Sequence, residues 1–129
     1  MQQKDVPPSR FFFRPPQPAD LFYVARWVAS FAGRSEEWQH NFYKLLLEEF
    51  KVTADVKQQM SWMAIAGDQR LFFLEMSSEG YVYITAPAKF FNDPRLALAV
   101  WQKIVIHLHR QGAIFPIKVI LYSSLPPSP

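Results

Sequence analysis

The apolar residues between positions 19 and 51 recur with the period of a helix. Pro18-Ala19-Asp20 begins a first helix, and Gly33 ends it as a left-handed cap. Ser35 with Glu36 and Glu37 begins a second helix, which should fade near Lys51, because a capping hydroxyl and early carboxylates suit the positive helix end. The apolar face of the first helix comprises Leu21, Val24, Ala25, Val28 and Phe31. The buried stripe predicted for the second comprises Phe42, Leu45, Leu46 and Phe50.

From residue 60 the period changes to two, which is typical of strands. Met60, Trp62 and Ala64 alternate with their neighbours, and Gly67-Asp68 predicts a tight turn into a second strand over 70–76. A turn at 77–80 leads to a third strand over 81–85, which is rich in aromatic and β-branched residues. Three strands joined by short turns predict an antiparallel meander.

The last third of the chain predicts one helix and one strand. Asn92-Asp93-Pro94 combines a capping side chain with proline at the first helical position, and Gly112 ends the helix. Residues 117–122 alternate as a strand, and Pro116 places its start at a sheet edge. The helix buries an arc that comprises Ala97, Val100, Trp101, Ile104 and Leu108.

These elements predict the α+β fold class, with the order α-α-β-β-β-α-β. We expect an antiparallel sheet of about four strands, the meander plus a C-terminal edge strand, packed against two or three helices. A chain of 129 residues is long enough for one core and too short for two. We therefore expect a proline-rich extended arm over residues 1–18, a single domain over 19–122 and a proline-containing tail over 123–129.

The arm carries three consecutive phenylalanines between two arginines. Its five prolines favour extended backbone. Large apolar side chains gain about 1.5–3 kcal/mol each from full burial, so a run of three should find a dock. The dock is either the arm's own domain or a partner, and the predicted partner-binding residues are Arg10, Phe11, Phe12, Phe13 and Arg14.

The composition of the chain excludes several classes of function. Half of the residues are hydrophobic, which predicts a folded chain, and the absence of cysteine excludes disulfides, thiolate nucleophiles and cysteine-based metal sites. The N-terminus lacks the pattern of a secretory signal, and no run reaches the roughly 18 apolar residues that a membrane helix needs. We expect a soluble, cytoplasmic protein with no membrane contact.

The candidate chemistry is sparse, and we expect neither an enzyme nor a bound cofactor or metal. His107 and His109 lie two apart on a helix and diverge by about 200°, so they cannot share one ion. Glu36 and His40 lie one turn apart but lack a nucleophile or a metal partner. No phosphate loop, nucleophile elbow or dinucleotide glycine pattern occurs.

A basic face on the last helix supports nucleic-acid binding as one alternative function. The net charge is +3, and both ends of the chain are basic while the middle is acidic. Arg95, Lys103 and Arg110 fall within about 80° of one another on the helix, with His107 at the border. Such a stripe with exposed aromatics could hold a strand of nucleic acid.

The surplus of aromatic residues favours a different function. The chain has twelve Phe, four Trp and five Tyr, more than one small core can bury. We therefore expect a non-catalytic protein–protein interaction or adaptor module that self-associates. Its expected partner is another protein, a second copy of itself in a homodimer, or both. In element order alone, residues 35–122 resemble class I type III secretion chaperones and related small dimeric chaperone-like folds. That resemblance implies a chaperone-like function as a second alternative.

Overall fold

The computed structural model describes residues 10–53, 60–77, 79, 81–87, 94–112 and 118–122. The predicted helix start at Asn92-Asp93, the predicted strand start at Pro116 and the tail over 123–129 lie outside the described residues, as does the side chain of Ala97. In chain order the elements are β1 (Phe12–Arg14), α1 (Pro18–Ala32), α2 (Glu36–Val52), β2 (Ser61–Ala66), β3 (Gln69–Met76), β4 (Tyr81–Thr85), α5 (Pro94–Arg110) and β5 (Lys118–Tyr122).

Within these residues the strands form one sheet in the order β1-β2-β3-β4-β5. Neighbours from β1 to β4 are antiparallel, whereas β5 pairs parallel to β4. The parallel pair follows from the connection, because the chain crosses from β4 to β5 through α5. The α+β class, the meander and the C-terminal edge strand are confirmed. The arm also contributes β1, a strand that was not predicted because the arm is rich in proline.

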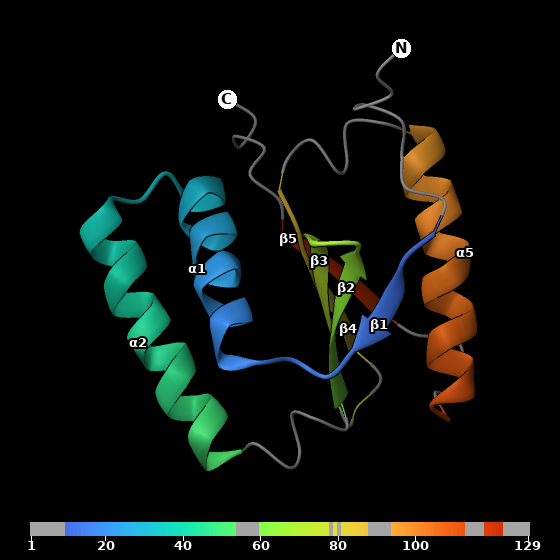
Figure 1. The fold of residues 1–129 in the computed structure, drawn as a ribbon, viewed down its shortest axis with the longest axis horizontal. Helices are drawn as coiled ribbons and strands as arrows, with labels where there is room; N and C mark the ends of the chain where they lie inside the picture. The colour runs from blue at the N-terminus through green and yellow to red at the C-terminus, as the bar shows by residue number, and fades with distance from the viewer. Residues whose placement is uncertain are drawn as a thin grey trace.

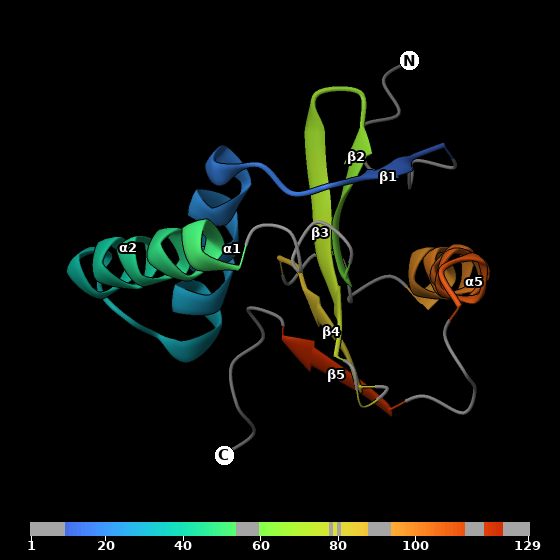
Figure 2. The same ribbon diagram turned by 90° about the horizontal axis from the view of Figure 1, so that it is seen from below.

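The helices lie on both faces of the sheet. α1 and α2 cover one face and α5 covers the other, so the domain has three layers (Figures 1 and 2). β2 and β3 are accordingly apolar at consecutive positions, as strands buried on both faces are. Met63 and Phe73 point to α1, whereas Trp62 and Leu74 belong to the cluster beneath α5.

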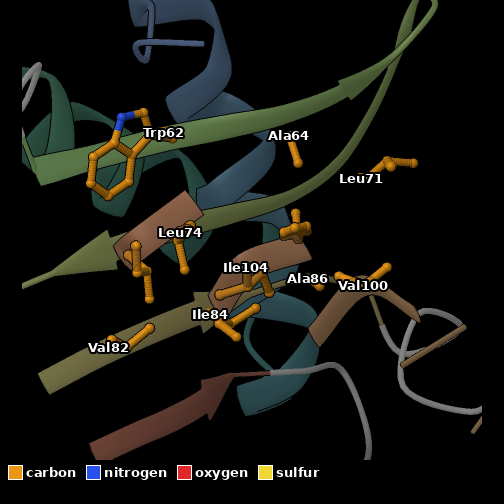
Figure 3. Close-up of a cluster of buried hydrophobic side chains, with 11 residues drawn as sticks. Trp62, Ala64, Leu71, Leu74, Val82, Ile84, Ala86, Val100 and Ile104 are labelled. Carbon is orange, nitrogen blue, oxygen red and sulfur yellow. The ribbon is translucent and has the colours of Figure 1, made fainter. Parts of the chain in front are cut away.

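The larger core lies between the sheet and α5 (Figure 3). Val100, Ile104 and Leu108 of the predicted arc are at most 2% exposed, and Trp101 packs against the cluster as a partly buried neighbour. From the sheet the cluster takes Trp62, Ala64, Leu71, Phe72, Leu74, Val82, Ile84 and Ala86. The predicted helical phase of α5 is therefore confirmed.

The predicted helix ends are also confirmed where the structure describes them. Gly33 ends α1 with φ 65°, a left-handed conformation that glycine adopts without strain. The Ser35 hydroxyl accepts a hydrogen bond of 3.1 Å from the Trp38 N–H at the start of α2. These caps join α1 and α2 into a helical hairpin.

Candidate functional site

The described end of the arm docks on its own domain. β1 pairs with β2, with Phe12 opposite Ile65, Phe13 opposite Ala64 and Arg14 opposite Met63. Because side chains alternate along a strand, Phe13 turns toward the core beneath α5 while Phe12 remains 56% exposed. The arm therefore closes one edge of the sheet.

Phe11 and Phe13 form an aromatic triangle with Phe72 of β3. The ring centroids lie 5.6 to 5.8 Å apart, and all three pairs are T-shaped. This arrangement is favoured because the positive edge of one ring meets the negative face of the next. Two of the three predicted partner-binding phenylalanines thus extend the protein's own core. Their role toward a partner stays a prediction, as does that of the exposed Phe12 and Arg10.

α5 holds the arm from the other side. The His107 ring stacks on Phe13 at 4.2 Å and meets Trp62 edge-on at 4.6 Å. Lys103 Nζ lies 4.4 Å from the centroid of the Phe11 ring, a cation–π geometry. Two residues of the predicted basic face therefore contact the arm.

The environment of His107 favours the neutral ring. Its Nε2 is buried and has no hydrogen-bond partner in the described part of the chain. Burial, and secondly the charge of Arg110, lower the pKa of His107 below its usual value of 6.5. His107 is thus mainly an aromatic packing residue at neutral pH.

Arg95 and Arg110 are exposed at the two ends of α5. They are about 22 Å apart along the helix axis, at 1.5 Å per residue. Since Lys103 and His107 between them face aromatic rings, the four residues do not form one continuous cationic stripe. Nucleic-acid binding by this face stays a prediction.

Arg14 is held by a buried carboxylate that the sequence assigned only to a helix start. Asp20 is fully buried at the start of α1, and it receives two hydrogen bonds from Arg14, at 2.6 and 2.9 Å. Arg70 Nε donates to Asp20 Oδ1 at 2.7 Å, and the Gln17 N–H donates to Asp20 Oδ2 at 2.7 Å. One carboxylate therefore joins the arm, α1 and β3.

The ionised form of Asp20 is favoured despite its burial. Burial is the largest single effect and opposes ionisation, but the hydrogen bonds from Arg14, Arg70 and Gln17 together outweigh it. The pKa of Asp20 consequently lies below its usual value, and the hydrogen bond to Asp20 raises the pKa of Arg14. The Arg70 guanidinium also lies over the Tyr23 ring at 4.3 Å. Because the Asp20 carboxylate is closed to solvent, we interpret this network as stabilising the fold.

α2 departs from the sequence prediction. None of its residues, all of which the structure describes, is buried, and Leu45 is 67% exposed rather than part of the buried stripe. Leu46 packs against the smaller hydrophobic cluster between α1 and the sheet, and Tyr43 meets Phe22 of α1 edge-on at 5.6 Å. That cluster comprises Val24, Trp27, Met63, Ile65 and Phe73. Leu45 is exposed because it lies outside the half-buried face of α2, which includes Tyr43, Leu46 and Phe50.

A second apolar stripe consequently faces outward from α2. Trp38 and Phe42 are half-buried and stack at 5.0 Å, and Arg34 lies over the Trp38 ring at 5.7 Å. Leu45 and Val52 are 67% and 82% exposed. At about 100° per residue these four apolar positions span an arc of about 80°, which Glu49 also occupies. We call Trp38, Phe42, Leu45 and Val52 the outer stripe.

An open hollow of about 420 Å³ lies beside the turn between β2 and β3. Arg26 and Arg70 line it together with Asp68, so it holds charges of both signs. Arg70 is already bound to Asp20. This hollow consequently has no clear preference for an anion.

The described residues contain no group of three or more histidine, aspartate or glutamate side chains placed to hold a metal ion. Among them, no helix is long and apolar enough to cross a membrane. Comparison with protein-family models, with curated proteins and with solved structures finds no match.

Proposed function

We propose that this protein is a non-catalytic interaction module that binds another polypeptide through the outer stripe of α2. The observation that carries the proposal is an apolar stripe on a helix with no buried residue, in which Leu45 and Val52 are exposed and Trp38 and Phe42 are half-buried. Single exposed apolar residues are common on protein surfaces, but a contiguous set is typical of an interface.

Four other large apolar residues are exposed in the described part of the chain, and they do not form a comparable surface. Phe22 of α1 is 41% exposed, and its ring meets Tyr43 of α2. Leu98 and Ile106 of α5 are 61% and 52% exposed, but they are about 12 Å apart along the helix and about 80° apart around it. Phe12 is exposed on the short edge strand β1. The outer stripe is therefore the better candidate for an interface.

The composition of the outer stripe also suits binding. Trp is enriched at the residues that contribute most to binding free energy, and its rigid ring loses little conformational entropy. The stacking of Trp38 on Phe42, with Arg34 above, holds both rings in place before any partner arrives. We place this function in the cytoplasm, because a cysteine-free chain is compatible with a reducing compartment.

Site-specific photocrosslinking tests the proposal. A photoreactive phenylalanine analogue at position 45, introduced in cells of the native source, should give discrete protein adducts on irradiation. The matched control is the same substitution at Ile106, which is similarly exposed on a helix but lies on the other face of the sheet. Adducts at both positions alike, or at neither, would contradict binding through the outer stripe.

A further inference from the structure

On the basis of the proposed function, we propose that the occupant of the outer stripe is a second copy of this chain. The two α2 helices would pack antiparallel about a two-fold axis that passes between the two Leu45 side chains. Antiparallel pairing reverses the residue order of the partner helix. Trp38 of one copy then lies opposite Val52 of the other, and Leu45 lies opposite Leu45.

The charges beside the outer stripe are complementary under this reversal. Glu37, Lys44, Glu48 and Lys51 are all exposed. They lie along one flank of the stripe, within an arc of about 60°. Along the helix the charges run negative, positive, negative, positive. In the reverse direction the same flank therefore begins with a positive charge.

In an antiparallel pair, each flank meets the same flank of the partner in reverse order. Glu37 then faces Lys51 of the second copy, and Lys44 faces Glu48. Each of these partners lies two residues, about 3 Å along the axis, from the position directly opposite, which is within reach of such long side chains. Lys44 lies equally near Lys44 of the second copy, so the Glu37–Lys51 pair carries the charge complementarity. Apolar contacts of Leu45 with Leu45 and of Trp38 with Val52, flanked by the Glu37–Lys51 pair, fit a second copy better than an arbitrary partner.

The position of α2 leaves room for this pairing. α2 lies on the outer side of α1, away from the sheet, in both views (Figures 1 and 2). Its 17 residues span about 25 Å, enough for several turns of contact. A single helix pair is a small interface, so we expect a dissociation constant on the order of micromolar.

Analytical ultracentrifugation of the full chain tests the pairing. At concentrations well above micromolar the mass should be twice the 15.1 kDa of one chain. Leu45→Glu places two like charges at the axis and should raise the dissociation constant at least about a hundredfold. Ile106→Glu is the matched control and should leave the mass unchanged. Melting curves confirm that both variants fold.

Charge reversal tests the register. Glu37→Lys or Lys51→Glu alone should weaken the dimer about tenfold, because each change sets like charges opposite one another. The double variant restores opposite charges across the interface and should recover most of the affinity. Equal losses in the single and double variants would overturn the antiparallel register.

Cysteine crosslinking tests the orientation, because the natural chain contains no cysteine. Leu45→Cys should form an intermolecular disulfide rapidly, since the two residues meet at the axis. In an antiparallel pair the two copies of position 52 are about 21 Å apart, far beyond the roughly 7 Å limit between Cα atoms, so Val52→Cys should not. Equal crosslinking at both positions would indicate parallel helices and overturn the proposal.

A protein that is monomeric throughout, or a dimer that Leu45→Glu leaves intact, would also overturn the second copy as the occupant. The proposed function can survive that result. If photocrosslinking at position 45 still captures a discrete protein other than this chain, the outer stripe binds that protein. Loss of both adducts and dimer would refute the two proposals together.

Discussion

The two faces of the sheet are covered in different ways. On one face α5 lies over the strands, and its central residues Val100, Ile104 and Leu108 are at most 2% exposed. On the other face α1 supplies the buried helical residues, and α2 packs outside it, with Leu46 against the same cluster but without a buried residue. α2 and α5 are both amphipathic helices of 17 residues. The difference teaches that an apolar stripe predicts burial only where another element lies over it.

The largest expected effect is in the core beneath α5. Ile104→Ala removes buried methyl groups and leaves a cavity, so it should cost about 2–5 kcal/mol of unfolding free energy. Leu45→Ala on α2 should cost less than about 1 kcal/mol of monomer stability, because its side chain is already exposed. Urea unfolding at low protein concentration measures both. Similar losses would break the contrast between the two helices.

Asp20→Asn should have the next largest effect. It removes the charge that Arg14 and Arg70 share, and hydrogen bonds to charged groups contribute about 1.5–3 kcal/mol. The folded-state pKa of Asp20 is lowered, so its stabilisation is present above the usual value of 3.8 and is lost as the pH falls through the folded value. Acid unfolding curves should show this component in the natural protein and lack it in Asp20→Asn.

The arm sharpens the comparison, because it adds to the better-covered face. Phe13→Ala should cost about 2 kcal/mol and increase the binding of a hydrophobic dye, since it opens the triangle with Phe11 and Phe72. Phe12→Ala is the matched control on the exposed side of the same strand and should change little. If both variants melt alike, the arm contributes nothing to the core.

The smallest expected effect is a pH dependence of the contact between the arm and α5. The folded-state pKa of His107 lies below 6.5, so stability is complete above that pH and declines as the pH falls through the folded value. His107→Phe keeps an aromatic ring beside Phe13 and should abolish this decline. Thermal melting between pH 7.5 and 5 measures the difference. Parallel curves for the two proteins would show that His107 does not titrate in this range.

Local patterns in the sequence determined the elements and their ends. The Ser35 cap, Gly33 and the arc of α5 were predictable because they depend on neighbours a few residues away. The class of the fold followed from the order of those elements. The metal-free interpretation of His107 and His109 rested on the same helical geometry.

Only the tertiary structure decided which surfaces are covered. The strand β1 was hidden because its pairing with β2 spans about fifty residues, and a proline-rich sequence gives no local strand pattern. The sequence places Lys103 and His107 on a basic face of the last helix. In the structure both side chains contact phenylalanines of the arm. Leu45 was assigned to the wrong side of α2, because that helix carries two adjacent apolar stripes. Periodicity reports that a residue is apolar, but burial depends on which distant element lies over it.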